Sequence, residues 1–142
     1  MDKIIALLML AWNSPIIKLV IVAVVMDTCF GFIRAIREHA FNSCVGIDGA
    51  IRKVSMLVSI AFLLLLDQII SLNLIGFIPA DARTYLPFST IGVAEFFGLL
   101  YLAYELVSIL KNMTLCGLPV KKIWGTIKKI LSKYTDELPD NN

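Results

Sequence analysis

Residues 54–78 read VSMLVSIAFLLLLDQIISLNLIGFI, an apolar stretch that is long enough to cross a membrane but contains an acid, Asp67. The hydrocarbon core of a bilayer is roughly 30 Å thick, and about 20 residues of α-helix cross it. An ionised carboxylate in hydrocarbon is unfavourable unless it faces another protein surface or water. The stretch therefore predicts a transmembrane helix whose acid faces the inside of a bundle or an assembly.

Two similar stretches lie on either side of it. Residues 16–36 contain Asp27, and residues 91–112 contain Glu95 and Glu105. Hydrophobic residues make up 58% of the 142-residue chain, whereas soluble domains are nearer 45–50% apolar. We therefore expect an all-α membrane protein with three transmembrane helices, forming a single domain over residues 1–142. Three crossings leave too little chain for a separate soluble catalytic domain.

The segments around the spans are predicted from composition. Residues 1–14 are too short to cross the bilayer and stop before Pro15, so we expect a short interfacial helix. Residues 37–53 contain a run of turn formers and predict a cytoplasmic turn, and Pro79 and Pro87 bracket an outer loop over residues 79–90. Residues 118–135 alternate apolar residues with lysines, which is typical of a basic amphipathic helix on an anionic inner leaflet. Residues 136–142 are polar and predict a disordered tail.

Positive charge predicts the orientation. The connection from Arg34 to Lys53 holds four basic residues, the segment from Lys111 onward holds six, and the outer loop holds only Arg83. Because Lys and Arg concentrate in cytoplasmic loops, the amino terminus is expected outside and the carboxyl terminus inside.

The polar residues of each predicted span fall on one face at 100° per residue. The acids outnumber the one basic residue expected at comparable depth, Lys18. We expect them to bond across helix or subunit contacts, to pair with basic residues at the cytoplasmic rim, or to meet water in an oligomer. The alternative is a monomeric bundle in which each acid locks neighbouring helices. The candidate assembly or pore-lining residues are Asp27, Arg34, Arg52, Lys53, Ser59, Asp67, Glu95, Tyr101, Glu105, Ser108 and Asn112.

No motif in the sequence predicts catalysis, a cofactor, a metal site or nucleic-acid binding. His39 is the sole histidine, and a solvated loop position suits it. Cys29, Cys44 and Cys116 lack metal-type or C-x-x-C spacing, and their odd number argues against a disulfide framework. We expect a protein that is not an enzyme.

Four segments of the chain resemble a known family. They are the run from Phe41 to Lys53, the segment Asp27–Arg34 before it, and the later elements ELVSILKNM (105–113) and CGLP (116–119). Together they are similar to the phage-lysis and toxin-secretion holins, most closely to the clostridial TcdE-like members. The similarity extends from about Ile17 to Glu137. Asp27, Arg52, Lys53, Glu105 and Asn112 are carried over as matched positions only.

The resemblance implies a small protein of the bacterial cytoplasmic membrane that self-associates and opens lesions. Through such lesions an endolysin, which is a cell-wall hydrolase, or a large protein toxin leaves the cell. Two other functions remain open: an antiholin that regulates a separate pore former, and a small ion channel or transporter subunit.

Overall fold

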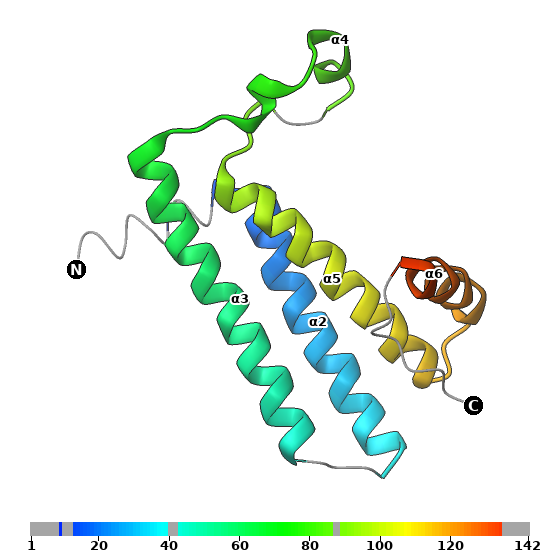
Figure 1. The fold of residues 1–142 in the computed structure, drawn as a ribbon. Helices are drawn as coiled ribbons and strands as arrows, with labels where there is room; N and C mark the ends of the chain where they lie inside the picture. The colour runs from blue at the N-terminus through cyan, green and yellow to red at the C-terminus, as the bar shows by residue number, and fades with distance from the viewer. Residues whose placement is uncertain (1–8, 10–12, 40–42, 87–88, 135–142) are drawn as a thin grey trace.

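The computed structural model describes residues 9, 13–39, 43–86 and 89–134, and within these ranges its regular structure is helical. Three long helices form a bundle: α2 (Pro15–Arg37), α3 (Ser43–Ile70) and α5 (Val93–Leu115). The short helices η1 (Leu74–Phe77) and α4 (Ala80–Arg83) lie between α3 and α5, and α6 (Lys121–Tyr134) follows α5 (Figure 1). Each of the three long helices is long and apolar enough to cross a membrane. The prediction of an all-helical chain with three candidate spans is confirmed.

Helix α5 is the centre of the bundle, because both α2 and α3 pack mainly against it and have few contacts with one another. Small residues on α5 allow α2 to approach closely. Ala94 is fully buried, and a Cβ placed on Gly98 would lie 3.2 Å from Ile16 and 3.7 Å from Val20. Small residues at such positions let membrane helices pack at short range. The apolar core consists of Ile17, Val20, Val24, Ile60, Leu64 and Ala94.

Helices α2 and α5 are joined a second time at their carboxyl ends. The Arg37 guanidinium donates a hydrogen bond to the carbonyl of Cys116, directly after α5. The next residue, Gly117, has φ +81°, in the left-handed region that glycine adopts without strain. A Cβ at Gly117 would also collide with the Arg37 guanidinium. This junction directs the chain from α5 into α6.

The bounds of α3 differ from those predicted for the second span. The helix begins at Ser43, inside the segment predicted as a cytoplasmic turn over residues 37–53, and it ends at Ile70 instead of residue 78. Gly46 and Gly49 lie within this helix, because a glycine inside a helix costs only about 0.5–1 kcal/mol relative to alanine. The prediction of a turn there is wrong, because continuation of the helix satisfies the backbone hydrogen bonds of these residues.

Polar side chains explain why α3 ends early. Ser71 has φ +49°, which takes the chain out of the helix. The Asn73 side chain then accepts hydrogen bonds from the backbone N–H groups of Ile75 and Ile91, at 3.1 and 3.2 Å. Asn side chains compete in this way with helical hydrogen bonding. Apolar composition alone made residues 71–78 look like a continuation of the span.

Part of the predicted organisation lies outside the described residues. This applies to most of the interfacial helix predicted for residues 1–14 and to the tail predicted for residues 136–142. Within the outer loop predicted for residues 79–90, α4 makes one helical turn, and Arg83 donates to the carbonyls of Ile78 and Gly76 at 2.6 and 2.7 Å.

Candidate functional site

A lysine between two carboxylates joins all three long helices. Lys53 Nζ on α3 lies 2.5 Å from Asp27 Oδ2 on α2 and 2.9 Å from Glu105 Oε2 on α5. The Glu105 side chain is 1% exposed and that of Asp27 is 9% exposed. Charge-assisted hydrogen bonds of this length are strong, and lipid offers no replacement for them. We call Lys53, Asp27 and Glu105 the charged cluster.

Asn112 extends the charged cluster toward the end of the bundle. Its side-chain amide donates to Asp27 Oδ1 at 2.8 Å, and both residues are buried. A Cβ placed on Gly31 of α2 would lie 3.7 Å from the Asn112 amide nitrogen, an ordinary contact distance, so the Asn112 side chain lies directly beside Gly31. Asp27 therefore receives one hydrogen bond on each of its oxygens.

The three charged residues lie at one depth in the bundle. Asp27 and Glu105 are each about 15 Å of helix before the ends of α2 and α5, and Lys53 is about 15 Å after the start of α3. Half of a hydrocarbon core roughly 30 Å thick is the same distance. Asp27 and Glu105 thus lie near the middle of their candidate spans, and Lys53 lies seven residues after the start of the second candidate span, Gly46–Ile70.

At the opposite end of α3, Asp67 caps helix α5. Its two carboxylate oxygens accept hydrogen bonds from the backbone N–H groups of Val93 and Ala94, each at 2.8 Å. The first N–H groups of a helix have no partner within the helix, and the positive end of its dipole favours an anion. The nearby Glu95 carboxylate accepts from the N–H of Gly92 at 2.7 Å. Both acids therefore accept hydrogen bonds from backbone N–H groups at the start of α5.

Two tyrosines of α5 make further polar contacts with α3, between the Asp67 cap and the charged cluster. The hydroxyls of Tyr101 and Ser59 are 2.8 Å apart. Arg52 donates to the Tyr104 hydroxyl, and its guanidinium carbon is 5.8 Å from the centre of the ring. We call this row of contacts between α3 and α5 the polar seam; its members on α3 are Arg52, Lys53, Ser59 and Asp67, and its members on α5 are Tyr101, Tyr104, Glu105 and the first N–H groups of the helix.

The structure brings together most of the residues singled out from the sequence. Asp27, Lys53, Glu105 and Asn112 meet in the charged cluster, and four others (Arg52, Ser59, Asp67 and Tyr101) belong to the polar seam. Three others lie elsewhere. Arg34 pairs with Glu38 at 3.0 Å on the exposed end of α2, Glu95 caps its own helix, and Ser108 is partly buried on α5.

One inference about the acids needs correction. Lys53 was placed at the cytoplasmic rim, so the acids seemed to lack a basic partner within the spans. Because α3 begins eleven residues earlier than the turn prediction allowed, Lys53 lies inside the helix and reaches two acids at once. Each of the four acids has a partner within one chain. The acids alone therefore do not require a second copy to shield them.

Sequence reasoning missed Tyr104, the partner of Arg52. The sequence did contain a signal for the face of α3 that meets α5. Lys53, Ile60 and Asp67 recur every seven residues, and residues two helical turns apart share a face. This spacing indicates one continuous face of α3, from the lysine through a buried isoleucine to the capping aspartate.

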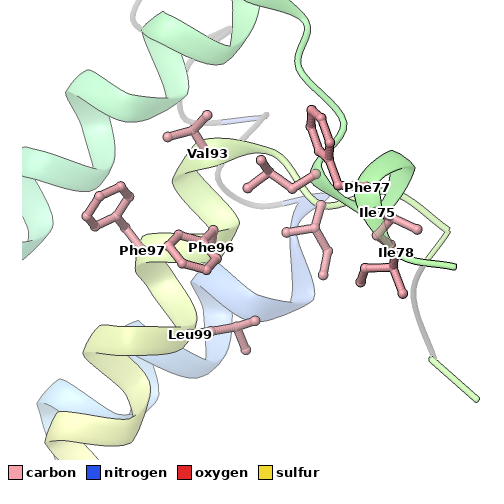
Figure 2. A pocket seen from close by; sticks show the side chains of 9 residues that line it. Ile75, Phe77, Ile78, Val93, Phe96, Phe97 and Leu99 are labelled. Atoms are coloured by element: carbon pink, nitrogen blue, oxygen red, sulfur yellow. The ribbon is translucent and has the colours of Figure 1, made fainter. Parts of the chain in front are cut away.

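A separate apolar pocket lies at the outer-loop end of the bundle, with a volume of about 490 Å³. Figure 2 shows its wall between η1 and the first turns of α5, with Phe77 on one side and Phe96 and Leu99 on the other. The described residues that line it all have apolar side chains, which offer neither catalytic groups nor metal ligands.

Comparison with known proteins identifies the family. The sequence model of the bacteriophage holin family matches residues 3–136. The chain belongs to the bacteriophage holin family. Over 123 residues this holin is 46% identical to the Holin-like protein TcdE of Clostridioides difficile, and the alignment covers 86% of this chain and 74% of that protein. No solved structure matches the chain.

The family assignment confirms three expectations from the sequence. Holins are membrane proteins without enzymatic activity, and they act in the cytoplasmic membrane. The three apolar helices of this holin agree with that location.

Proposed function

We propose that this holin self-associates in the bacterial cytoplasmic membrane and opens lesions through which a cytoplasmic endolysin or a large protein toxin leaves the cell. The observation that carries the proposal is the match to the holin family along almost the whole chain. The polar seam is consistent with it, because ionisable side chains within membrane helices face either the interior of a bundle or a water-filled cavity.

The proposed orientation places the amino terminus outside and the carboxyl terminus inside. The end of α2, the start of α3, the end of α5 and α6 all lie at one end of the molecule (Figure 1). That end carries Arg34, Arg37 and Lys111 together with the lysines of α6, whereas Arg83 lies at the other end. The positive-inside rule then assigns the lysine-rich end to the cytoplasm.

Helix α3 is the element best suited to move. The α2–α5 contact is extensive and is built on small and apolar residues, whereas α3 contacts α5 over a smaller region and α2 hardly at all. Within lipid there is no hydrophobic driving force for helix association. The hydrogen bonds of the polar seam therefore contribute much of the interaction that keeps α3 packed on α5.

The need of polar side chains for hydrogen-bond partners then explains opening. In one closed copy the seam is satisfied internally. If α3 separates from α5, the exposed side chains cannot face lipid and must meet water or the same side chains of other copies. Several copies gathered around water satisfy all of them, which links self-association to permeabilisation.

The test is expression of the chain alone in a bacterium that holds an active muralytic enzyme in its cytoplasm. We expect turbidity to collapse abruptly after a period of accumulation, and to persist in matched cells whose muralytic enzyme is inactive. A chain that leaves the cells intact would be a regulator of another pore former. A chain that dissipates the membrane potential without releasing the enzyme would be a small channel. Either result would overturn the proposal.

A further inference from the structure

Helix α6 carries five positive charges and no negative charge over its whole length. It contains Lys121, Lys122, Lys128, Lys129 and Lys133, and no Asp or Glu lies between Lys121 and Tyr134. Like charges this dense repel one another along a helix. A surface of opposite charge would reduce this repulsion.

The apolar side of α6 is only partly covered within the chain. Trp124, Ile127 and Leu131 are partly buried, whereas Ile123 is 54% exposed and Ile130 is 55% exposed. At 100° per residue, Ile123 and Ile130 lie within about 20° of each other around the helix. They form an exposed apolar edge that runs along α6, and we call these two residues the free edge.

The lysines lie on both sides of the apolar residues. By the same geometry, Lys122, Lys129 and Lys133 lie next to the free edge, and Lys121 and Lys128 lie beyond the partly buried residues. Lysine stems can lie along apolar surface while their ammonium groups reach outward. Apolar residues between two rows of lysines are typical of helices that lie in the interface of an anionic bilayer.

The position of α6 also favours a membrane surface. It starts six residues after α5 ends at Leu115, and Gly117 and Pro119 lie in the connection. Figure 1 shows α6 beside this end of α5 and turned away from the direction of the bundle. In the proposed arrangement α5 crosses the membrane, which places the start of α6 near the level where that span leaves the hydrocarbon.

We propose that the free edge of α6 docks on anionic phospholipid of the leaflet at which α5 ends. The inference rests on the proposed function for its orientation, which makes this the cytoplasmic leaflet. The headgroups neutralise the lysines, and Ile123 and Ile130 enter the boundary between headgroups and acyl chains. Docking holds the carboxyl end of α5 at a defined depth and aligns neighbouring copies on one surface.

The test uses the full chain reconstituted in vesicles, with tryptophan as the reporter. In a W12F/W124F background, Ile130→Trp places the single tryptophan on the free edge. Its quenching by lipids brominated in their acyl chains is compared between neutral phosphatidylcholine vesicles and vesicles with about one third phosphatidylglycerol. We expect clearly stronger quenching in the anionic vesicles, and loss of the difference at high salt.

Substitution of the adjoining lysines sharpens the test. Each lysine removed by Lys122→Gln or Lys129→Gln should lower the ratio of docked to undocked helix about fivefold in anionic vesicles. Lys111→Gln removes an exposed lysine outside α6 and should leave the ratio unchanged. The inference would be overturned if quenching were equal in neutral and anionic vesicles and were unchanged by Lys122→Gln and Lys129→Gln. That result would indicate that protein covers the free edge. This measurement needs insertion but no lesion, so its failure is distinguishable from failure of the proposed function.

Discussion

At the scale of single residues, Lys53 has the largest effect on the stability of the three-helix bundle. It pairs with Asp27 and Glu105, which would otherwise be two buried carboxylates without a cation. A buried ion pair contributes little relative to apolar residues of the same size, but removal of one partner leaves an uncompensated charge. The cluster therefore makes the bundle sensitive to the loss of one side chain.

We predict that Lys53→Met destabilises the folded bundle by about 3–5 kcal/mol, because both carboxylates lose their cation. Thermal unfolding of the purified protein in detergent measures the change. The triple variant K53M/D27N/E105Q removes all three charges and should recover much of the lost stability. Lys111→Met is the matched control, since Lys111 is exposed at the end of α5. If Lys53→Met and Lys111→Met unfold alike, the charged cluster does not stabilise the fold.

A second prediction concerns Asp67 and Gly92. Asp67→Ala removes the cap of α5 and should cost about 0.5–2 kcal/mol. Gly92→Ala should have a similar effect, because its new Cβ would lie 2.6 Å from Asp67 Oδ2 and displace the carboxylate. The two changes act on one contact, so the double variant should be little worse than either single variant. Simple addition of the two effects in a double-mutant cycle of thermal unfolding would contradict this account.

At the scale of elements, the two contacts of α5 differ in kind. Its contact with α2 depends on small residues and close apolar packing, whereas its contact with α3 depends on the polar seam. Replacement of a small residue should therefore weaken the first contact, and loss of a polar side chain should weaken the second.

We predict that Gly98→Val separates α2 from α5, because even a Cβ at this position would lie 3.2 Å from Ile16 and valine adds two more carbons. Overpacking of a closely packed site typically costs about 1–3 kcal/mol. Gly125→Ala on α6 is the control, since nothing lies within 4 Å of its added Cβ, and it should be neutral or slightly stabilising. Thermal unfolding in detergent compares the two variants, and equal stability would show that α2 does not pack on Gly98.

At the scale of the whole molecule, the proposed opening of α3 makes two substitutions act in opposite directions. Lys53→Met leaves two unpaired acids in the closed bundle, and water relieves them once α3 separates. Glu105→Leu leaves the balanced pair of Lys53 with Asp27 and removes an acid that would face water in the open state. The closed state is weakened in the first variant and the open state in the second.

We therefore predict that Lys53→Met advances lysis and that Glu105→Leu delays it, at matched amounts of protein in the membrane. The time of turbidity collapse in cells with the muralytic enzyme measures both. Immunoblots of membrane fractions control for insertion. A shift of both variants in the same direction would refute separation of α3 as the opening step.

Much of the architecture could be predicted from residue types and their order. Apolar composition and length predicted three spans, and the described residues contain three helices that are long and apolar enough to cross a membrane, because the bilayer imposes a minimum length on any helix that crosses it. Helical periodicity also placed Asp27, Glu105 and Asn112 on faces turned toward other helices, and all three are buried. The basic segment after the third span contains α6, because its apolar residues recur at helical spacing.

The partners of the acids depended on tertiary structure. Whether Lys53 lies in a turn or in a helix depends on where α3 begins, and its two acid partners come from helices that are distant in sequence. The end of α3 at Ile70 likewise depends on Asn73, whose side chain bonds Ile91 eighteen residues away. Local composition determines that a segment is apolar enough to cross a membrane. Which polar groups meet inside it is decided by packing, because each hydrogen bond needs a donor and an acceptor brought together from different helices.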